Sequence, residues 1–439
     1  MVERLFHLEA QGTNVRTEVL GGVTTFMTMA YIVFVNPAVL SGTGMDFGAV
    51  MTATCLSAGI ATLAMGLLAN YPIALAPGMG ENFFFLTVCV GMGVSWQVAL
   101  AAVFISGVVF VLLTFLRIRE MIIDAIPPSL KHAIAVGIGL FIAFIGFVGA
   151  GIAEKADTGM LMHLGDLSRK PVLVACFGLL LTIALLGRRI KGAILIGILA
   201  SAALAWALGL VQWQGLVSMP PSMSSTFMKL DIRGLLDAAM VPVIVIFLFM
   251  AVFDAIGTLI GVSDRAGLLK DGKLPRATRA LLADSSGTVF GSIFGTSTVT
   301  AYIESATGVE AGARTGLANV VTGALFFLVL FFAPLVKMVG GGVMLESGGA
   351  LQPITAPALI VVGCFMVGSI RKIEWDNFTE AFPAFLVMIG IPFSWSIADG
   401  IAFGFISYPA LKIVTGRWRE ISPLVYFLGL LFVSRYIFL

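Results

Sequence analysis

Charged side chains are scarce in this sequence of 439 residues. Aspartate, glutamate, lysine and arginine together make up 11% of the chain, whereas a soluble globular domain carries roughly 25%. Hydrophobic residues make up 59%, which excludes an ordinary water-exposed surface and places the chain among membrane proteins. The net charge of +2 is too close to balance to indicate a nucleic-acid partner, and we expect none.

Histidine and cysteine, which commonly bind metals, are also few. The three histidines lie far apart, and the four cysteines stand alone in apolar segments without a CxxC pair, so we interpret the cysteines as small core residues. The chain has neither a GxxxxGKS/T motif nor an HExxH motif, which excludes an ATP-driven pump within this chain and a zinc protease of that class. We expect no cofactor, no metal site and no enzymatic activity; a membrane enzyme is the weakest alternative.

Long apolar runs are what the sequence has in abundance. A membrane helix needs about 20 apolar residues, and fourteen runs come close to or reach this length: 20–40, 49–69, 72–93, 96–116, 131–150, 171–187, 191–210, 238–262, 280–295, 297–312, 315–336, 354–370, 379–396 and 399–415. An apolar tail at 421–438 crosses the bilayer or lies at its interface. The sequence therefore predicts an all-α polytopic membrane protein with fourteen transmembrane segments.

The lysines and arginines indicate how these segments are oriented. Cytoplasmic loops retain positive charge during insertion. With the N-terminal segment 1–18 inside, 19 of the 26 basic residues fall on the cytoplasmic side and six outside. We therefore expect a multi-pass protein of the plasma or inner membrane with a cytoplasmic N-terminus.

The two sets of seven runs resemble each other weakly. The first run contains TTFMTMAYIVF and the eighth FLFMAVFDAIGTL, while KGAILIGILAS in the seventh parallels ADGIAFGFISY in the fourteenth. Because seven is odd, the second set must enter the membrane from the opposite side. Inverted repeats of this kind are typical of secondary transporters, whose substrate site lies near the bilayer midplane.

Two runs in matching positions of the repeats are interrupted. The third contains NYPIALAPGMGEN, with two prolines and two glycines at membrane depth, and the tenth contains GTSTVTAYIESATG. Each pattern predicts a short extended piece leading into a half-helix. Extended backbone leaves its polar groups unpaired in lipid, so it survives only where it is buried in protein or lines a cavity. A packing kink is the alternative for either run alone.

Acidic side chains lie beside these breaks. Asp254 stands in the middle of the eighth run, with Thr258 one turn later on the same helix face; Glu304 follows the break in the tenth run, and Glu81 and Asn82 follow that in the third. A charge at the centre of a membrane helix costs about 2.5–3.5 kcal/mol on insertion scales, so such residues usually face a cavity and carry a function. A carboxyl group that gains and loses a proton there couples proton occupancy to ligand binding.

Structural roles remain open for each acid. Asp254 and Glu304 could be bonded to neighbouring hydroxyl groups, and Glu81 could only complement a helix dipole. Asp284, in LLADSSGT, is either a helix cap or a functional acid, and Asp399 is interpreted as part of a hairpin connection.

The motifs RTEVLGGVTTFMTMAYIVFVNP, APGMGEN, FDAIGT, AYIESATG and PFSWSIADGIAFG, between Arg16 and Arg419, resemble the nucleobase/cation symporter-2 family, in particular its AzgA-like branch of purine permeases. The resemblance implies a uracil-permease-like fold with a 7+7 inverted repeat and extended pieces in segments 3 and 10. It further implies a core domain from 19–116 and 235–337, a gate domain from 117–212 and 354–416, and a homodimer.

The resemblance also implies roles for individual residues. Asp254 and Glu304 would bind the base and take part in proton coupling, Thr258 stands where uracil permease has a histidine, and Asn82 matches a functionally important amide of the branch. The backbone around Ala76 would add hydrogen bonds. The aromatic rings of Phe83 or Tyr302 would stack on the base. Glu81 departs from the family pattern, in which we expect an apolar residue, and is a further candidate for proton coupling.

The sequence thus predicts a secondary active transporter that imports purine nucleobases (adenine, guanine or hypoxanthine) by proton symport, with the core moving against the gate. The alternatives are an anion channel or exchanger of the same architecture and a transporter of another nucleobase such as uracil or xanthine.

Overall fold

The computed structural model describes residues 2–116, 127–155, 162–237, 240–269, 274–344 and 350–438. Four of the basic residues used to orient the chain, Arg117, Arg119, Lys270 and Lys273, lie outside these ranges.

The N-terminal repeat is helical apart from three short strands. It consists of α1 (Val2–Phe6), α2 (Val15–Met29), α3 (Ile32–Ser41), α4 (Phe47–Ala64), β1 (Leu75–Pro77), α5 (Met79–Gly91), α6 (Trp96–Leu116), α8 (Pro128–Gly149), β2 (Ala153–Lys155), β3 (Met162–Leu164), α9 (Lys170–Gly187) and α10 (Ala193–Ala207). A π-helical turn, η2 (Met65–Ala69), extends α4, and a 3₁₀ turn, η1 (Glu9–Gln11), precedes α2.

The C-terminal repeat follows the same plan. After the turn η3 (Arg233–Leu236) come α11 (Met240–Arg265), α12 (Ala277–Phe294), β4 (Val299–Ala301), α13 (Ser305–Glu310), α14 (Gly316–Val329), η4 (Leu330–Phe332), α15 (Ala333–Gly340), β5 (Val343–Met344), β6 (Ala350–Leu351), α16 (Ala356–Val367), η5 (Gly368–Lys372), α17 (Phe378–Ser394), α18 (Ile397–Val414), η6 (Trp418–Glu420) and α19 (Pro423–Phe438).

The predicted fold class is confirmed: every one of the fourteen apolar runs contains helix, and the third and tenth also contain a strand. Within the described residues, eight helical segments are long and apolar enough to cross a membrane by themselves. The number of crossings therefore stays a prediction.

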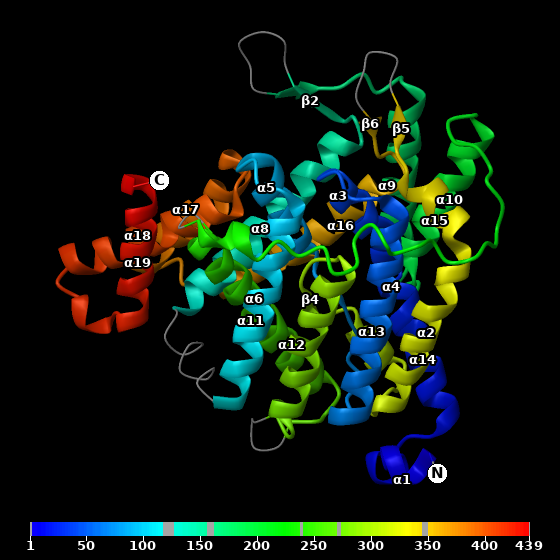
Figure 1. The fold of residues 1–439 in the computed structure, drawn as a ribbon, viewed down its shortest axis with the longest axis horizontal. Helices are drawn as coiled ribbons and strands as arrows, with labels where there is room; N and C mark the ends of the chain where they lie inside the picture. The colour runs from blue at the N-terminus through cyan, green and yellow to red at the C-terminus, as the bar shows by residue number, and fades with distance from the viewer. Residues whose placement is uncertain are drawn as a thin grey trace.

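The two broken segments pair with each other. Strand β1 lies antiparallel to β4, with Leu75 opposite Ala301 and Pro77 opposite Val299. One more hydrogen bond extends the ladder at each end. Gly78 N–H donates to the carbonyl of Thr298 at 2.9 Å, and Tyr302 N–H donates to the carbonyl of Ala74 at 3.0 Å. Extended backbone at membrane depth is thereby supplied with partners from the opposite repeat. Figure 1 shows β4 in the middle of the molecule, surrounded by helices.

Equivalent contacts hold the two strands to their own repeats. The hydroxyl group of Thr62 on α4 donates to the carbonyl of Leu75 at 2.9 Å, and that of Thr288 on α12 donates to the carbonyl of Val299 at 2.8 Å. On α12, a Cβ atom at Gly287 would lie 2.9 Å from the side chain of Ala61, and one at Gly291 would lie 2.9 Å from the side chain of Val299. These two glycines therefore allow α12 to pack closely against α4 and β4.

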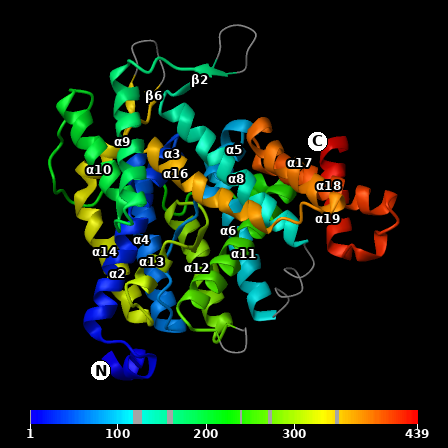
Figure 2. The same cartoon turned by 180° about the vertical axis from the view of Figure 1, so that it is seen from behind.

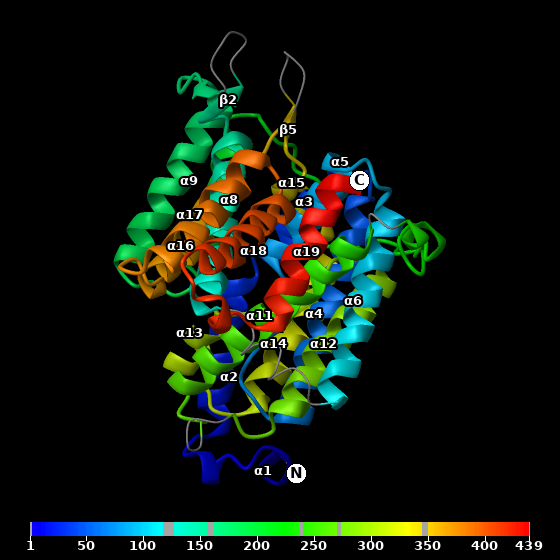
Figure 3. The same ribbon diagram turned by 90° about the vertical axis from the view of Figure 1, so that its left-hand side faces the viewer.

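The helices form two groups. Helix α8 packs against α16 and α17, α17 packs against α18, and α9 lies against α10 and α16. In the other group α12 packs against α4 and α6, while α14 packs against α2 and α4. Figure 2 shows α8, α16 and α17 adjacent to one another, and Figure 3 shows this group on one flank with α18. The division of the chain into a core and a gate domain stays a prediction.

A buried ion pair fixes the connection that follows α18. The Nζ of Lys412, a residue with 2% side-chain exposure, lies 3.0 Å from Glu380 Oε1 and 2.8 Å from Glu420 Oε2. The hydroxyl group of Tyr408 donates a further bond of 3.0 Å to Glu380. Hydrogen bonds from Arg417 and Lys412 lower the pKa of Glu420 to about 2. This network joins α17, α18 and η6.

We predict that Lys412→Met destabilises the protein strongly, because it leaves the Glu380 carboxylate buried without its cation, a change that typically costs about 3–5 kcal/mol. Thermal unfolding of the purified protein in detergent measures the effect. The double variant Lys412→Met/Glu380→Gln should recover part of the loss. A melting temperature for Lys412→Met equal to that of the wild type would contradict this assignment.

Candidate functional site

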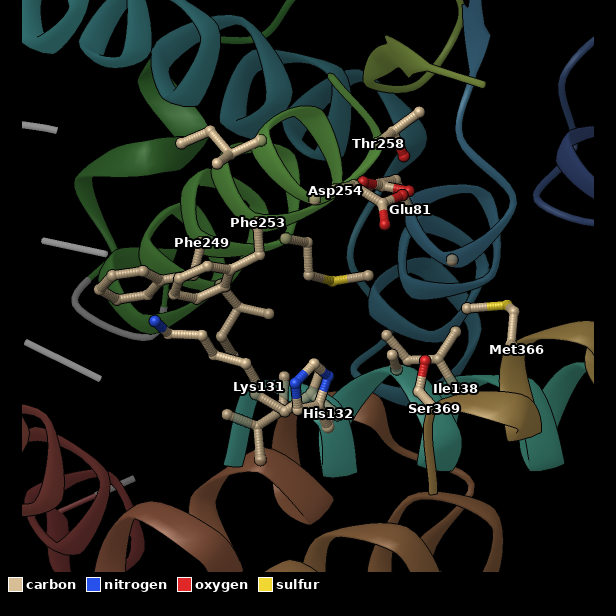
Figure 4. A pocket seen from close by; sticks show the side chains of 18 of the residues that line it. Glu81, Lys131, His132, Ile138, Phe249, Phe253, Asp254, Thr258, Met366 and Ser369 are labelled. Carbon is tan, nitrogen blue, oxygen red and sulfur yellow. The ribbon is translucent and has the colours of Figure 1, made fainter. Parts of the chain in front are cut away.

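A cavity of about 410 Å³ lies between the two helix groups, within the size range of small-molecule sites. Helices α5 and α11, which pack against α6, form one wall together with Ile303. Helices α8, α16 and α18, the turn η5, and α19, which packs against α18, form the other wall. Most lining residues are apolar, and the polar and charged ones are Glu81, Lys131, His132, Asp254, Thr258, Ser369 and Lys372. Figure 4 shows the carboxyl groups at one end of the cavity, with Lys131 and His132 across from them.

Three of the predicted site residues meet at this end. Asp254 and Thr258 project from one face of α11, four residues apart, and Glu81 comes from the first turn of α5. Asp254 is exposed to the cavity, whereas Glu81 is 1% exposed. Among the described residues, neither carboxyl oxygen of Glu81 has a hydrogen-bond partner. The alternative that Glu81 only complements the dipole of α5 stays open, because Glu81 lies in the first turn of that helix.

Glu304 occupies a different environment. It stands directly before α13 and is not part of the cavity lining. Its Oε1 accepts a hydrogen bond of 2.6 Å from the hydroxyl group of Tyr31, which lies between α2 and α3. Asp254 is close enough to interact electrostatically with Glu304. The hydroxyl group that binds the Glu304 side chain is therefore that of a tyrosine in the opposite repeat, not that of a Ser or Thr, and a structural role for this acid stays open.

The remaining predicted residues lie around the strand pair and outside the cavity lining. Ala76 pairs with Thr300 in the ladder. The side chain of Asn82 is fully buried and its Oδ1 accepts a hydrogen bond from the hydroxyl group of Ser297. Both residues therefore join the two broken segments.

The two aromatic candidates are also buried. The hydroxyl group of Tyr302 donates to the carbonyl of Pro77 at 2.5 Å, and its ring lies 6.4 Å from that of Tyr31. Phe83 packs edge-to-face on Phe141 of α8, with ring centroids 6.4 Å apart. Stacking of either ring on a ligand stays a prediction.

Asp284 is not a helix cap. Helix α12 begins at Ala277, so Asp284 lies in its third turn, fully buried and without a hydrogen-bond partner in the described part of the chain. It is not among the cavity-lining residues. Asp399 lies in the first turn of α18, just after the α17–α18 connection, and accepts a bond of 2.7 Å from the hydroxyl group of Tyr436 on α19.

Several cavity residues were not predicted from the sequence. Lys131 was used only to orient the chain, and His132 was considered only as one of three histidines far apart in the sequence. The Nζ of Lys131 lies 5.9 Å from the ring centroid of Phe253. The apolar tail contributes Leu428 and Phe432, both 1% exposed, from α19. No local sequence pattern marks Leu428 and Phe432 as cavity residues, because their position in the wall depends on how α19 packs against α18.

Comparison with known proteins agrees with this architecture. A guanine/hypoxanthine permease of Bacillus subtilis is 46% identical and an adenine permease of Escherichia coli 45% identical; each alignment covers 100% of this chain and, respectively, 100% and 96% of the relative. The transmembrane domain of a cyanobacterial bicarbonate transporter has the same fold, with a TM-score of 0.63 at 12% identity over 88% of this chain and 97% of that one.

The model of the permease family matches residues 16–403. The chain therefore belongs to this permease family and, within it, groups with the purine permeases that its motifs indicated.

Proposed function

We propose that the protein imports purine nucleobases across the cell membrane by proton symport. The observation that carries the proposal is the presence of two carboxyl groups, Asp254 and Glu81, at one end of a 410 Å³ cavity between the two helix groups. Purine bases carry several N–H donors on a flat ring, and carboxyl oxygens are strong acceptors for them. The adenine and guanine/hypoxanthine permeases among its relatives support the same substrate class.

Three of the residues predicted from the sequence have direct roles in this proposal. Asp254 binds an edge of the base and exchanges a proton, and Thr258 adds a hydroxyl group one turn away. Glu304, held by Tyr31, shares in binding and proton coupling from behind the strand pair. Neighbouring carboxyl groups seldom remain ionised together, so arrival of a proton and arrival of a neutral base favour each other.

Alternating access follows from the position of the cavity. Its walls come from both helix groups, so a rigid movement of the core (19–116 and 235–337) against the gate (117–212 and 354–416) would open it to either side of the membrane. We place the N-terminus in the cytoplasm on the basis of the basic residues, and propose a homodimer.

Anion exchange is the second candidate, because the bicarbonate transporter shares the fold. Fold alone does not determine substrate. The carboxyl groups in the cavity would repel an anion, although Lys131 and Lys372 also line it. Bicarbonate or chloride flux in proteoliposomes without any response to purines would favour this candidate.

We predict that Asp254→Asn abolishes proton-driven accumulation of purine, because the amide cannot carry the proton. The measurement is uptake of labelled guanine, hypoxanthine and adenine in cells lacking their own permeases, with and without a protonophore and across external pH. Surface expression is the control. Wild-type uptake and wild-type pH dependence in the variant would show that Asp254 has no such role.

We also predict that Tyr31→Phe weakens transport about 10- to 100-fold in apparent affinity or rate, since a hydrogen bond to a charged group contributes about 1.5–3 kcal/mol. Removal of one oxygen atom leaves Glu304 without its 2.6 Å donor. Tyr426→Phe is the matched control. Tyr426 lies on α19, and its hydroxyl group donates an exposed hydrogen bond to the carbonyl of Trp418 in η6. Equal kinetics for the two variants would argue against a functional Tyr31–Glu304 pair.

A further inference from the structure

Glu81 differs from every other acid in the described part of the site. It is the third residue of α5, and its carboxyl group reaches the cavity beside Asp254 (Figure 4). A methyl group added at Gly78 would collide with its Oε2. The absence of a side chain at Gly78 therefore leaves room for the carboxyl group at the end of the β1–β4 ladder.

Both oxygens of this carboxyl group are buried and unpartnered among the described residues. A buried polar group without a hydrogen bond costs stability, and a charged one costs more. The dipole of α5 favours a negative charge at this position, but it supplies neither oxygen with a partner of hydrogen-bond geometry among the described residues. Two acceptors side by side, facing a cavity, fit a ligand that brings two adjacent N–H donors.

Among the purines, guanine presents this pattern on its Watson–Crick edge. Its N1–H and its exocyclic 2-amino group point in the same direction and match the two oxygens of one carboxylate. Hypoxanthine keeps N1–H but lacks the amino group, xanthine replaces the amino group with a carbonyl oxygen, and adenine has an acceptor at N1.

We propose that Glu81 is a specificity-determining residue that selects guanine by accepting both of these N–H groups. This inference rests on the proposed function, since it concerns which purine the same cavity prefers. Asp254, the second carboxyl group at this end of the cavity, stays available to hold the proton while Glu81 is ionised. A leucine at position 81 would fill the same space without either acceptor.

The test compares uptake of labelled guanine and labelled hypoxanthine by the full-length protein in cells without their own purine permeases. We expect the wild type to prefer guanine, with xanthine and adenine as weaker competitors. Glu81→Leu should lower the guanine-to-hypoxanthine ratio about 10- to 100-fold, the range associated with a bidentate pair. Glu81→Gln should lower it as well, because the amide offers only one acceptor, and it serves as the measurement if the leucine variant fails to reach the membrane.

Asp399→Asn is the control. Asp399 does not line the cavity, and its carboxyl group accepts a hydrogen bond from Tyr436 on α19, so its replacement should leave the ratio unchanged. A guanine-to-hypoxanthine ratio in Glu81→Leu or Glu81→Gln equal to that of the wild type would overturn the inference, as would a wild type that prefers hypoxanthine or adenine. Absence of all purine uptake by the well-expressed wild type would instead contradict the proposed function.

Discussion

The antiparallel pairing of β1 with β4 is the contact on which the rest of the site depends. Each strand by itself would expose amides and carbonyls at membrane depth, at a cost of several kcal/mol for each unpaired group. Pairing across the two repeats removes this cost for both. It also sets the positions of the half-helices α5 and α13, because each begins within a few residues of the ladder. The backbone pairing therefore sets where the two acids that follow, Glu81 and Glu304, enter the structure.

The repeats share a framework but differ in chemistry. Thr62 and Thr288 hold equivalent strands in equivalent ways, as expected for an inverted repeat. The acids after the strands do not match. Glu81 lines the cavity, and its oxygens have no hydrogen-bond partner among the described residues, whereas Glu304 accepts a hydrogen bond from Tyr31 outside the cavity lining. The two repeats thus share a backbone framework but place their acids in different environments. The purine substrate that we propose also has chemically different edges.

The sequence was sufficient to predict the features that depend on local composition. The length of the apolar runs indicated the helices, and proline and glycine indicated the breaks. The rarity of acids in membrane helices pointed to Asp254, Glu304 and Glu81, of which Asp254 and Glu81 line the cavity. Features that depend on distant partners could not be predicted. The bond between Tyr31 and Glu304 joins residues 273 positions apart, and the ambiguity at Asp284 arose because the start of α12 cannot be located to within one turn from composition. The same limit explains why α19 was recognised as apolar but not as a wall of the cavity.

The position of α19 has a mechanical consequence. Gly429 allows close approach to the Phe405 carbonyl of α18, and the rings of Phe405 and Phe432 lie 6.1 Å apart, so α19 is fastened to the group that contains α17 and α18. Leu428 and Phe432 nevertheless line the same cavity as Asp254 on α11. Under the proposed movement, α19 would travel with the gate and change the apolar lining opposite the carboxyl groups. Asp254 on α11 and Glu81 on α5 would then stay in place in the core. The apolar surface that shields them from water would move with the gate domain.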